Sequence, residues 1–118
     1  MLSHSTPGYA RLFLTGLQDI PWEKINAETK IVIFRALQEL MVNMNKHSKA
    51  KIIGINFRKI TPKLQITYSD NGIGATMEEL KKGSGLQNVE NRIVSIGGTF
   101  NFQSEKEKGF SANFLIPV

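Results

Sequence analysis

Residues 64–74, LQITYSDNGIG, decide the fold. Apolar side chains stand at every second position of the first half, at Leu64, Ile66 and Tyr68, which is typical of a strand with one buried face. The pattern then breaks at residues 70–74, DNGIG, all but one of which favour turns. An ionised aspartate at a strand end accepts hydrogen bonds only, and glycines beside it let the backbone approach a flat ligand closely. A plain turn and a site for the exocyclic amine of adenine are both consistent with these residues.

The remaining strands follow from the same alternation. Residues 53–57 carry it before a turn at Thr61-Pro62, so residues 53–68 predict a hairpin. Residues 99–104 and 110–116 carry it again and predict a closing hairpin, and Arg11–Leu17 predicts a short strand. The side chains expected to face inward are Ile53, Ile55, Phe57, Phe100, Phe102, Phe110, Ala112, Phe114 and Ile116.

Two helices are expected between these strands. Asn26 offers a cap for a long amphipathic helix that ends near His47, and a second helix runs from about Leu86 to Gly97-Gly98. Thr76 and Glu79 have the spacing of a capping box for one further helical turn. The apolar stripe expected to enter the core from the first helix is Ile33, Phe34, Leu37, Leu40, Met41 and Met44. This order of elements predicts an α+β, two-layer α/β sandwich: a mainly antiparallel mixed sheet with helices on one face.

Composition limits the possible classes of protein. The 118 residues suffice for one domain, expected over residues 9–118 after a flexible tail at 1–8. The absence of cysteine excludes disulfides and thiolate sites, and the sequence contains neither a signal-peptide pattern nor an apolar run long enough to span a membrane. The net charge of +5 favours anionic partners, but the basic residues are scattered, so nucleic acid is not expected. A cytoplasmic location fits these features.

A second polar motif lies on the first helix. Glu39 and Asn43 are four residues apart and project from one face, with Lys46-His47 following. A carboxylate and an amide placed in this way can orient a proton acceptor and give one oxygen to Mg²⁺, which takes its other ligands from phosphates and water. Taken alone, a solvated helix face explains the pattern at least as well.

The third motif is Gly83-Ser84-Gly85-Leu86, which opens the second helix. Backbone N–H groups and the positive end of the helix dipole favour phosphate at such a place. The motif is weak by itself. It is neither a P-loop, since Gly-Lys-Ser/Thr is absent, nor a dinucleotide fingerprint, which follows a strand directly.

Taken in order, the three motifs resemble the Bergerat-type ATPase superfamily of histidine kinases, GyrB-like topoisomerase subunits, ninety-kilodalton heat-shock chaperones and MutL-type repair ATPases. The resemblance runs from about Arg11 to Pro117. Residues 36–50, ALQELMVNMNKHSKA, are similar to the asparagine box of the histidine kinases, and residues 83–98, GSGLQNVENRIVSIGG, to their second glycine box. The short loop and small size resemble the branch of nitrate and desiccation-type sensors.

The resemblance implies ATP and Mg²⁺ as cofactors and a role for each matching residue. Glu39 orients or deprotonates the acceptor and is the catalytic candidate, while Asn43 holds Mg²⁺. Asp70 reads adenine. The other residues implied to bind ATP are Lys46 and His47 at the phosphates, Gly72 and Gly74 at the base pocket, and Gly83, Ser84, Gly85 and Leu86 at the β- and γ-phosphates.

One position departs from the family pattern. The closing hairpin of the family carries a threonine after its glycine, close to adenine, whereas here Gly109 is followed by Phe110. Ser111 is the candidate substitute. The water-mediated adenine contact of the family is therefore in question.

The implied function is the ATP-binding catalytic domain of a sensor histidine kinase, which transfers the γ-phosphate to a histidine. Neither His4 nor His47 has the setting of an acceptor, so the acceptor is expected on a separate dimerisation domain of the same kinase. The kinase as a whole is expected to be a homodimer that passes phosphate to a response regulator and is anchored in the inner membrane or free in the cytoplasm, and the isolated domain to be monomeric. Two alternatives remain: a serine kinase of the anti-sigma-factor type, and a nucleotide-binding module without catalysis.

Overall fold

The computed structural model describes residues 11–47, 49–72, 77–81, 85–105 and 108–118. The predictions for the tail at 1–8, for Gly74, Thr76, Gly83 and Ser84, and for the side chains of Lys46, His47 and Glu79 lie outside this described part. The strands are β1 (Arg11–Thr15), β2 (Ile52–Ile60), β3 (Lys63–Asp70), β4 (Thr99–Glu105) and β5 (Gly109–Pro117). The helices are α1 (Ala27–His47), α2 (Met77–Lys81) and α3 (Leu86–Val94), with short 3₁₀ turns at Leu17–Asp19 and Trp22–Lys24.

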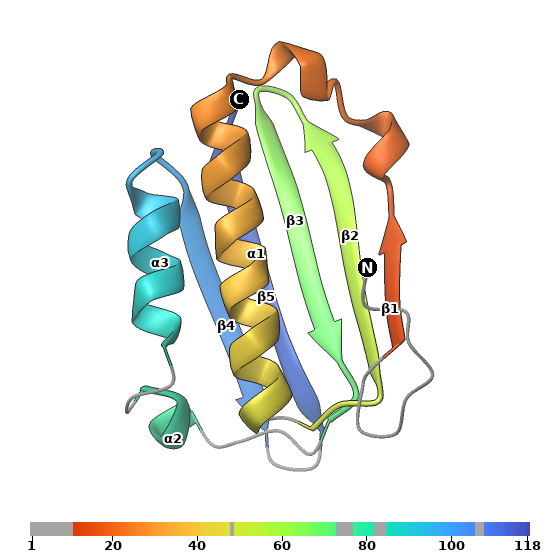
Figure 1. Ribbon diagram of the computed structural model, residues 1–118, viewed down its shortest axis with the longest axis vertical. Helices are drawn as coiled ribbons and strands as arrows, with labels where there is room; N and C mark the ends of the chain where they lie inside the picture. Colours follow the sequence, from red (N-terminus) through yellow and green to blue (C-terminus); the bar gives the residue numbers. More distant parts are fainter. Residues whose placement is uncertain (1–10, 48, 73–76, 82–84, 106–107) are drawn as a thin grey trace.

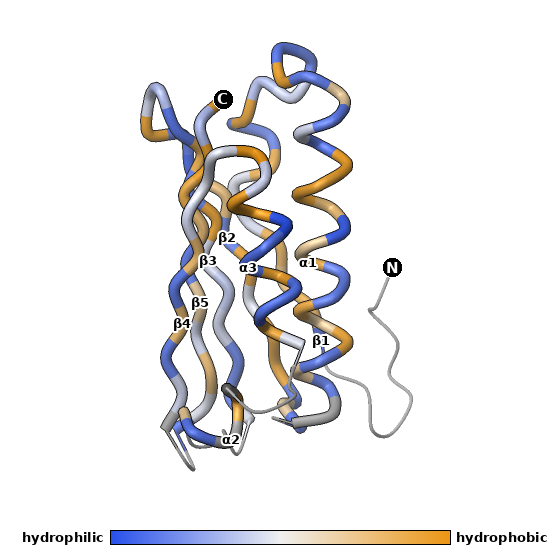
Figure 2. Tube along the Cα trace, turned by 90° about the vertical axis from the view of Figure 1, so that its left-hand side faces the viewer, coloured by the Kyte–Doolittle hydropathy of each residue, from blue (hydrophilic) through white to orange (hydrophobic). Residues whose placement is uncertain are grey.

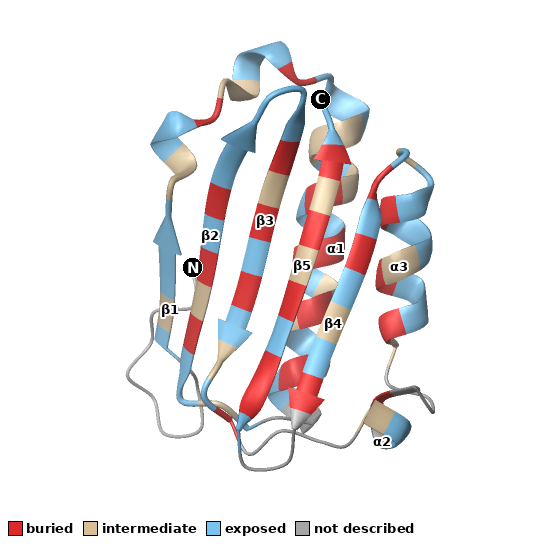
Figure 3. Cartoon of the chain, turned by 180° about the vertical axis from the view of Figure 1, so that it is seen from behind, coloured by how far each residue is buried: buried red, intermediate tan, exposed pale blue. Residues whose placement is uncertain are grey.

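The five strands form one sheet in the order β1-β2-β3-β5-β4 (Figure 1). Only the β1–β2 pairing is parallel; the other three pairings are antiparallel. Helices α1 and α3 lie across one face, and the opposite face is open when the molecule is seen from behind (Figure 3). The predicted mixed sheet with helices on one side, and both predicted hairpins, are confirmed.

The core lies between the two layers, where hydrophobic stretches of the sheet and of α1 meet (Figure 2). Alternate residues of β2, β3 and β5 are buried, as the period-two patterns predicted. On α1 the stripe needs one correction: Phe34 is 66% exposed, whereas Ala36 is fully buried. Phe34 follows the inward-facing Ile33 by one helical step of about 100°, which turns its side chain off the seam between helix and sheet.

The residues predicted to cap the start of α1 and to end α3 adopt capping geometry. Asn26 Oδ1 accepts a hydrogen bond of 2.8 Å from the backbone N–H of Thr29, which caps α1. After α3, Gly97 adopts φ +80°, and the N–H of Gly98 donates to the carbonyl of Ile93 at 2.9 Å. Strand β1 ends at Thr15, earlier than predicted, because Gly16 turns the chain with φ +83°. A Cβ at Gly16 would lie 2.0 Å from the carbonyl oxygen of Phe57, so only glycine fits this turn.

Candidate functional site

The chain brings its polar motifs to one end of the sandwich. The end of β3, the end of α1, the start of α3 and the start of β5 all lie at the same end of the molecule (Figure 1). Two clusters of contacts are formed there. We call the one around Asp70 the base end and the one around Asn43 and Gly85 the phosphate end, after the ligand groups that the sequence predicts for them.

At the base end, the carboxylate of Asp70 is half-buried and held by donors on both oxygens. Oδ1 accepts hydrogen bonds from the backbone N–H groups of Gly72, at 3.0 Å, and Phe110, at 3.2 Å. Oδ2 accepts one from the hydroxyl of Tyr68, at 3.2 Å. The β3–β5 register sets this geometry, because it pairs Asp70 with Phe110 across the ladder. A carboxylate fixed in this way presents a defined acceptor to a ligand.

An aromatic cluster packs beneath the carboxylate. The rings of Tyr68 and Phe110 meet edge to face with centroids 5.7 Å apart, and Phe110 stacks on Phe102 at 5.9 Å. Tyr68 is fully buried and Phe110 is 2% exposed. Burial raises the pKa of the Tyr68 phenol far above its usual range, and the charge of Asp70 and the hydrogen bond to it raise that pKa further. The phenol is therefore a permanent donor at any physiological pH.

Two residues that shape the base end were given no such role in the sequence analysis. The side-chain oxygen of Asn71 accepts hydrogen bonds from the backbone N–H groups of Lys51 and Ile52, at 3.0 and 2.9 Å, and so ties the start of β2 to the end of β3. Gly109 adopts φ +88°, and a Cβ there would lie 2.2 Å from the carbonyl oxygen of Asp70. Asparagine and glycine are common turn residues at strand ends, so the sequence could not show that these two make contacts at the site.

At the phosphate end, Gly85 caps α3 with φ +84° and packs directly on Asn43 of α1. A Cβ on Gly85 would lie 2.5 Å from Nδ2 of Asn43, so the approach requires glycine. The Nδ2 group is buried and has no hydrogen-bond partner among the described residues. A buried amide group without a partner costs about 1–3 kcal/mol, which a polar ligand can recover. Leu86, the first residue of α3, is buried in the core.

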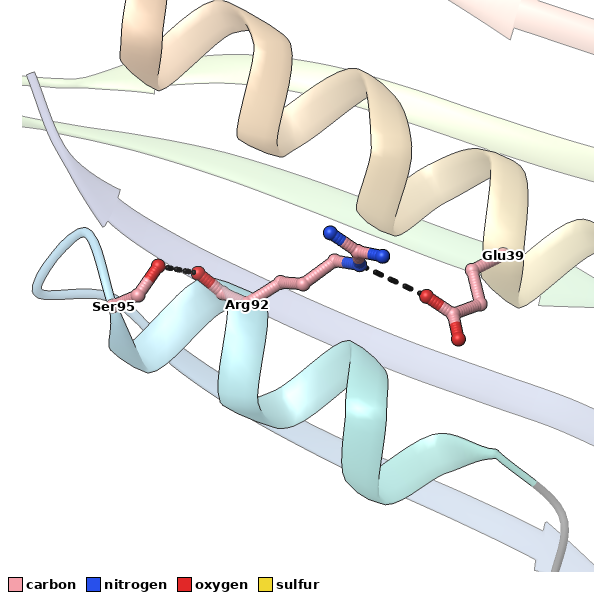
Figure 4. Close-up of polar contacts among 3 residues, drawn as sticks. All are labelled: Glu39, Arg92 and Ser95. Atoms are coloured by element: carbon pink, nitrogen blue, oxygen red, sulfur yellow. Dashed lines mark hydrogen bonds and ion pairs between the residues drawn. The ribbon is translucent and has the colours of Figure 1, made fainter.

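Glu39 lies on α1 one turn before Asn43 and reaches across to α3 (Figure 4). Its Oε2 accepts from Nε of Arg92 at 2.9 Å, in an ion pair whose side chains are 26% exposed for Glu39 and 43% for Arg92. Ser95 donates its hydroxyl to the carbonyl oxygen of Arg92 at 2.6 Å. The spacing of Glu39 and Asn43 was visible in the sequence, but the partner of Glu39 was not, since Arg92 is 53 residues away.

Ser111, the candidate substitute for the missing threonine, lies on the other face of the sheet from the side chain of Asp70. It is exposed between the buried Phe110 and Ala112, so its side chain points to the open face of the sheet, opposite the inward-facing neighbours of Asp70. There it lines a hollow of about 330 Å³ whose other lining residues include Asp70, Phe110, Ser69, Gln103 and Lys108. The role of Ser111 as a substitute for the threonine of the family stays a prediction. The preceding residue, Phe110, contacts Asp70 through its backbone N–H.

Metal-ligand clusters and membrane-spanning helices were sought in the described residues. Within them, three or more histidine, cysteine, aspartate or glutamate side chains do not gather into a set that could hold a metal ion. In that same part of the chain, none of the helices has the length and apolar character needed to cross a bilayer.

The comparisons with known proteins concern the family and the fold. Residues 28–118 match the family model described as histidine kinase-, DNA gyrase B- and HSP90-like ATPase. The chain is 36% identical over 84 residues to the sensor histidine kinase YdfH of Bacillus subtilis, covering 68% of this chain and 21% of that protein. It is 30% identical over 105 residues to the sensor histidine kinase LiaS of the same organism, covering 85% of this chain and 29% of that protein.

Solved structures give the same picture. The histidine kinase domain of the blue-light activated histidine kinase of Erythrobacter litoralis EL346 superposes with a TM-score of 0.74 at 18% identity, over 90% of this chain and 53% of that one. The histidine kinase AdeS of Acinetobacter baumannii gives a TM-score of 0.61 at 27% identity, over 73% of this chain and 45% of that one. The first likeness concerns the fold alone. The chain spans between 13% and 29% of the length of the curated relatives compared.

Proposed function

This chain belongs to the family of histidine kinase-, DNA gyrase B- and HSP90-like ATPases, and from that premise we propose that it is the ATP-binding catalytic domain of a sensor histidine kinase. The observation that carries the proposal is the contact between Asn43 and Gly85. This contact joins α1, which carries Asn43, to the glycine that precedes α3. The amide nitrogen of Asn43 is buried there and has no partner among the described residues. A polar ligand at this junction explains why the fold tolerates that cost.

The proposed reaction is phosphoryl transfer from ATP to a histidine of a separate dimerisation domain. The bond between the γ-phosphorus and the bridging oxygen of ADP breaks, a bond from phosphorus to an imidazole nitrogen forms, and the imidazole loses a proton. In such reactions the protein mainly positions the nucleotide and neutralises charge. The chain accordingly contributes two binding regions: the base end positions the adenine, and the phosphate end, at the start of α3, positions the phosphates.

The residues divide these tasks. Asp70 accepts a hydrogen bond from the exocyclic amine of adenine, and Gly72, whose N–H is bonded to that carboxylate, keeps the loop close to the base. Asn43 and Gly85 lie at the phosphates. Glu39, oriented by Arg92, faces the acceptor histidine, which it orients or deprotonates.

Magnesium fits the donor set present here. Asn43 offers one amide oxygen, and Mg²⁺ in nucleotide sites takes most of its ligands from phosphates and water, so a single protein oxygen is sufficient. When bound, the ion would neutralise the charge of the β- and γ-phosphates. Asn43 would hold the ion through its amide oxygen.

Nucleotide titration tests the first half of the proposal. The chain is titrated with a non-hydrolysable ATP analogue, with and without Mg²⁺, as wild type and as Asp70→Asn. Replacing a charged acceptor by an amide should weaken binding about tenfold to a hundredfold. Thr67→Ala, on the same strand but the exposed face, is the matched control and should bind as wild type. No binding by wild type at millimolar analogue would overturn the proposal.

Phosphotransfer tests the second half. The dimerisation domain of the same kinase is added with radiolabelled ATP, and the label should be acid-labile, as a phosphorus–nitrogen bond requires. Acid-stable label on a serine of a separate protein would favour a serine kinase of the anti-sigma-factor type instead. Binding without any transfer would favour a nucleotide-binding module. Homodimerisation of the kinase and a response regulator as final acceptor belong to the same proposal.

A further inference from the structure

Tyr68 lies beneath the base end, and the proposed function leaves it unused. We propose that Tyr68 is a positioning residue for nucleobase selection: its hydroxyl orients the carboxylate of Asp70 and thereby favours purines that carry an amine at C6. The inference rests on the proposed function, since it concerns how Asp70 meets adenine. Sequence patterning treats Tyr68 only as an inward-facing strand residue, equivalent to Leu64 and Ile66.

The hydroxyl of Tyr68 is held in place by packing. The residue is fully buried, at 0% exposure, and belongs to the core cluster. Its ring meets Phe110 edge to face, and Phe110 in turn stacks on Phe102. A ring confined on these sides loses little further freedom when its hydroxyl makes a hydrogen bond, so the bond to Asp70 acts as a fixed strut.

Among the donors in the described part of the chain, the Tyr68 hydroxyl and the backbone N–H groups bond different oxygens of Asp70. The N–H groups of Gly72 and Phe110 both donate to Oδ1 of Asp70. The Tyr68 hydroxyl donates to Oδ2 at 3.2 Å. Donors on both oxygens restrict rotation of the carboxylate about its terminal bond, which is otherwise a broad torsion. A ligand amine then meets an acceptor whose direction is already set, and preorganisation of this kind raises affinity by lowering the entropy lost on binding.

Protonation favours the same arrangement. Because burial and the neighbouring Asp70 raise the pKa of the Tyr68 phenol, the hydroxyl keeps its proton and can only support a charged Asp70, never compete with it as an anion. An ionised Asp70 accepts hydrogen bonds and donates none. It therefore suits the amine of adenine and opposes the carbonyl of guanine or hypoxanthine at the same position.

The test compares nucleotides that differ only in the amine. Wild type and Tyr68→Phe are titrated with ATP and with purine riboside triphosphate, which lacks the exocyclic amine. Removing the hydroxyl should weaken ATP binding about threefold to tenfold, the usual range for one hydrogen bond. Binding of the amine-free nucleotide should change by less than twofold, so the preference for ATP should fall. A double-mutant cycle with Asp70→Asn should remove most of the effect, because Tyr68 acts through Asp70.

Phenylalanine keeps the ring, and thermal unfolding identifies folded variants before binding is compared. Ser69→Ala, which removes an exposed hydroxyl next to Tyr68 in the chain but on the other face of the sheet, is the matched control. Equal weakening of both nucleotides would mean that Tyr68 only stabilises the fold, and unchanged ATP affinity would mean that the strut is irrelevant; either result overturns the inference. Wild type that binds neither nucleotide overturns the proposed function as well.

Discussion

The two ends of the site differ in how completely their polar groups are partnered. At the base end, the carboxylate of Asp70 has donors on both oxygens and a packed aromatic cluster beneath it. At the phosphate end, the buried Nδ2 of Asn43 has no partner among the described residues and lies against the backbone of Gly85. Under the proposed function, the base end is therefore formed before the nucleotide binds, whereas the phosphate end gains a partner for Nδ2 from the nucleotide.

This difference suggests a division of the binding energy. A preformed base pocket gives selectivity at low entropic cost, since little has to be ordered when the base binds. A phosphate end with an unsatisfied group gains more from its ligand, because the unbound state carries the desolvation cost. Changes at the base end should thus affect stability and base choice, and changes at the phosphate end should affect the response to the triphosphate.

The largest expected effect is on stability, at the base end. Phe110→Thr, which restores the residue type of the wider family, should lower the free energy of unfolding by about 3 kcal/mol, because large-to-small changes at packed aromatic positions cost this much. Phe110 is 2% exposed and contacts both Tyr68 and Phe102. Urea unfolding followed by tryptophan fluorescence of Trp22 measures the change.

Phe34→Thr provides the control for that loss. Phe34 is 66% exposed on α1, so the same substitution there should cost less than about 1 kcal/mol. Similar losses at both positions would contradict the assignment of Phe110 as the packed floor of the base end. A stable Phe110→Thr variant with unchanged ATP affinity would show that this end does not depend on its aromatic cluster.

The second prediction concerns the phosphate end. Gly85→Ala should weaken ATP binding about tenfold or more and leave adenosine binding nearly unchanged, because the new Cβ would lie 2.5 Å from Nδ2 of Asn43. The left-handed backbone at φ +84° should also cost about 1–2 kcal/mol of stability. Calorimetric titration with the two ligands separates the phosphate-dependent part of the affinity.

Gly54→Ala is the matched control for this variant. A Cβ at Gly54 would meet only Ser69 Oγ at 3.6 Å, an ordinary contact, and no unusual backbone conformation is involved. Its nucleotide binding should equal that of wild type. If Gly85→Ala weakened adenosine and ATP to the same degree, the two ends would not be separable, and the comparison drawn above would fail.

The buried faces of the strands and the ends of the helices could be predicted from the sequence. Period-two alternation located the buried residues of β2 and β3, because burial on one face imposes that pattern directly. Asn26 and the Gly97-Gly98 pair marked helix ends because capping is local chemistry. Phe34 was wrongly included in the core stripe, since a helical wheel shows the apolar arc but not how far the sheet extends beneath it.

The contacts of the site were harder to foresee because they depend on register. The approach of Phe110 to Asp70 depends on β3 pairing with β5, and the bond from Arg92 to Glu39 depends on α1 lying beside α3. The outward face of Ser111, in contrast, follows from alternation within one strand, because Phe110 and Ala112 on either side of it face inward. The sequence shows which side chains share a face of one helix or strand. It does not show which strands pair or which helices pack together.

The third prediction uses alkaline pH to probe the base end. Tyr68 has a pKa raised above its ordinary value of 10.0 in the folded state, so above about pH 10 the unfolded chain loses this proton and the folded chain keeps it. The tyrosine then lowers the free energy of unfolding as pH rises, with a slope of at most about 1.4 kcal/mol per pH unit. Below pH 10 both states are protonated and the residue contributes no pH dependence.

Tyr68→Phe isolates this contribution from the titration of lysines. The difference in unfolding free energy between wild type and variant should be constant up to about pH 9 and should then shift in favour of the variant. Chemical denaturation at a series of pH values measures it. Parallel curves up to pH 11 would show that the phenol ionises in the folded state, which would contradict its burial beneath Asp70.

The smallest effect is expected for Arg92→Gln, at the ion pair between α1 and α3. Both side chains are partly exposed, and such pairs contribute at most about 1 kcal/mol, so stability should fall by less than that and ATP affinity by less than twofold. Arg92→Lys keeps the charge and serves as the control. Phosphotransfer should slow more than binding weakens, because Glu39 keeps its place on the helix but loses its orientation. A tenfold loss of ATP affinity would instead mean that this ion pair keeps α1 and α3 together and so holds Gly85 against Asn43. The phosphate end would then depend on a contact outside it, whereas the base end depends on contacts between its own residues.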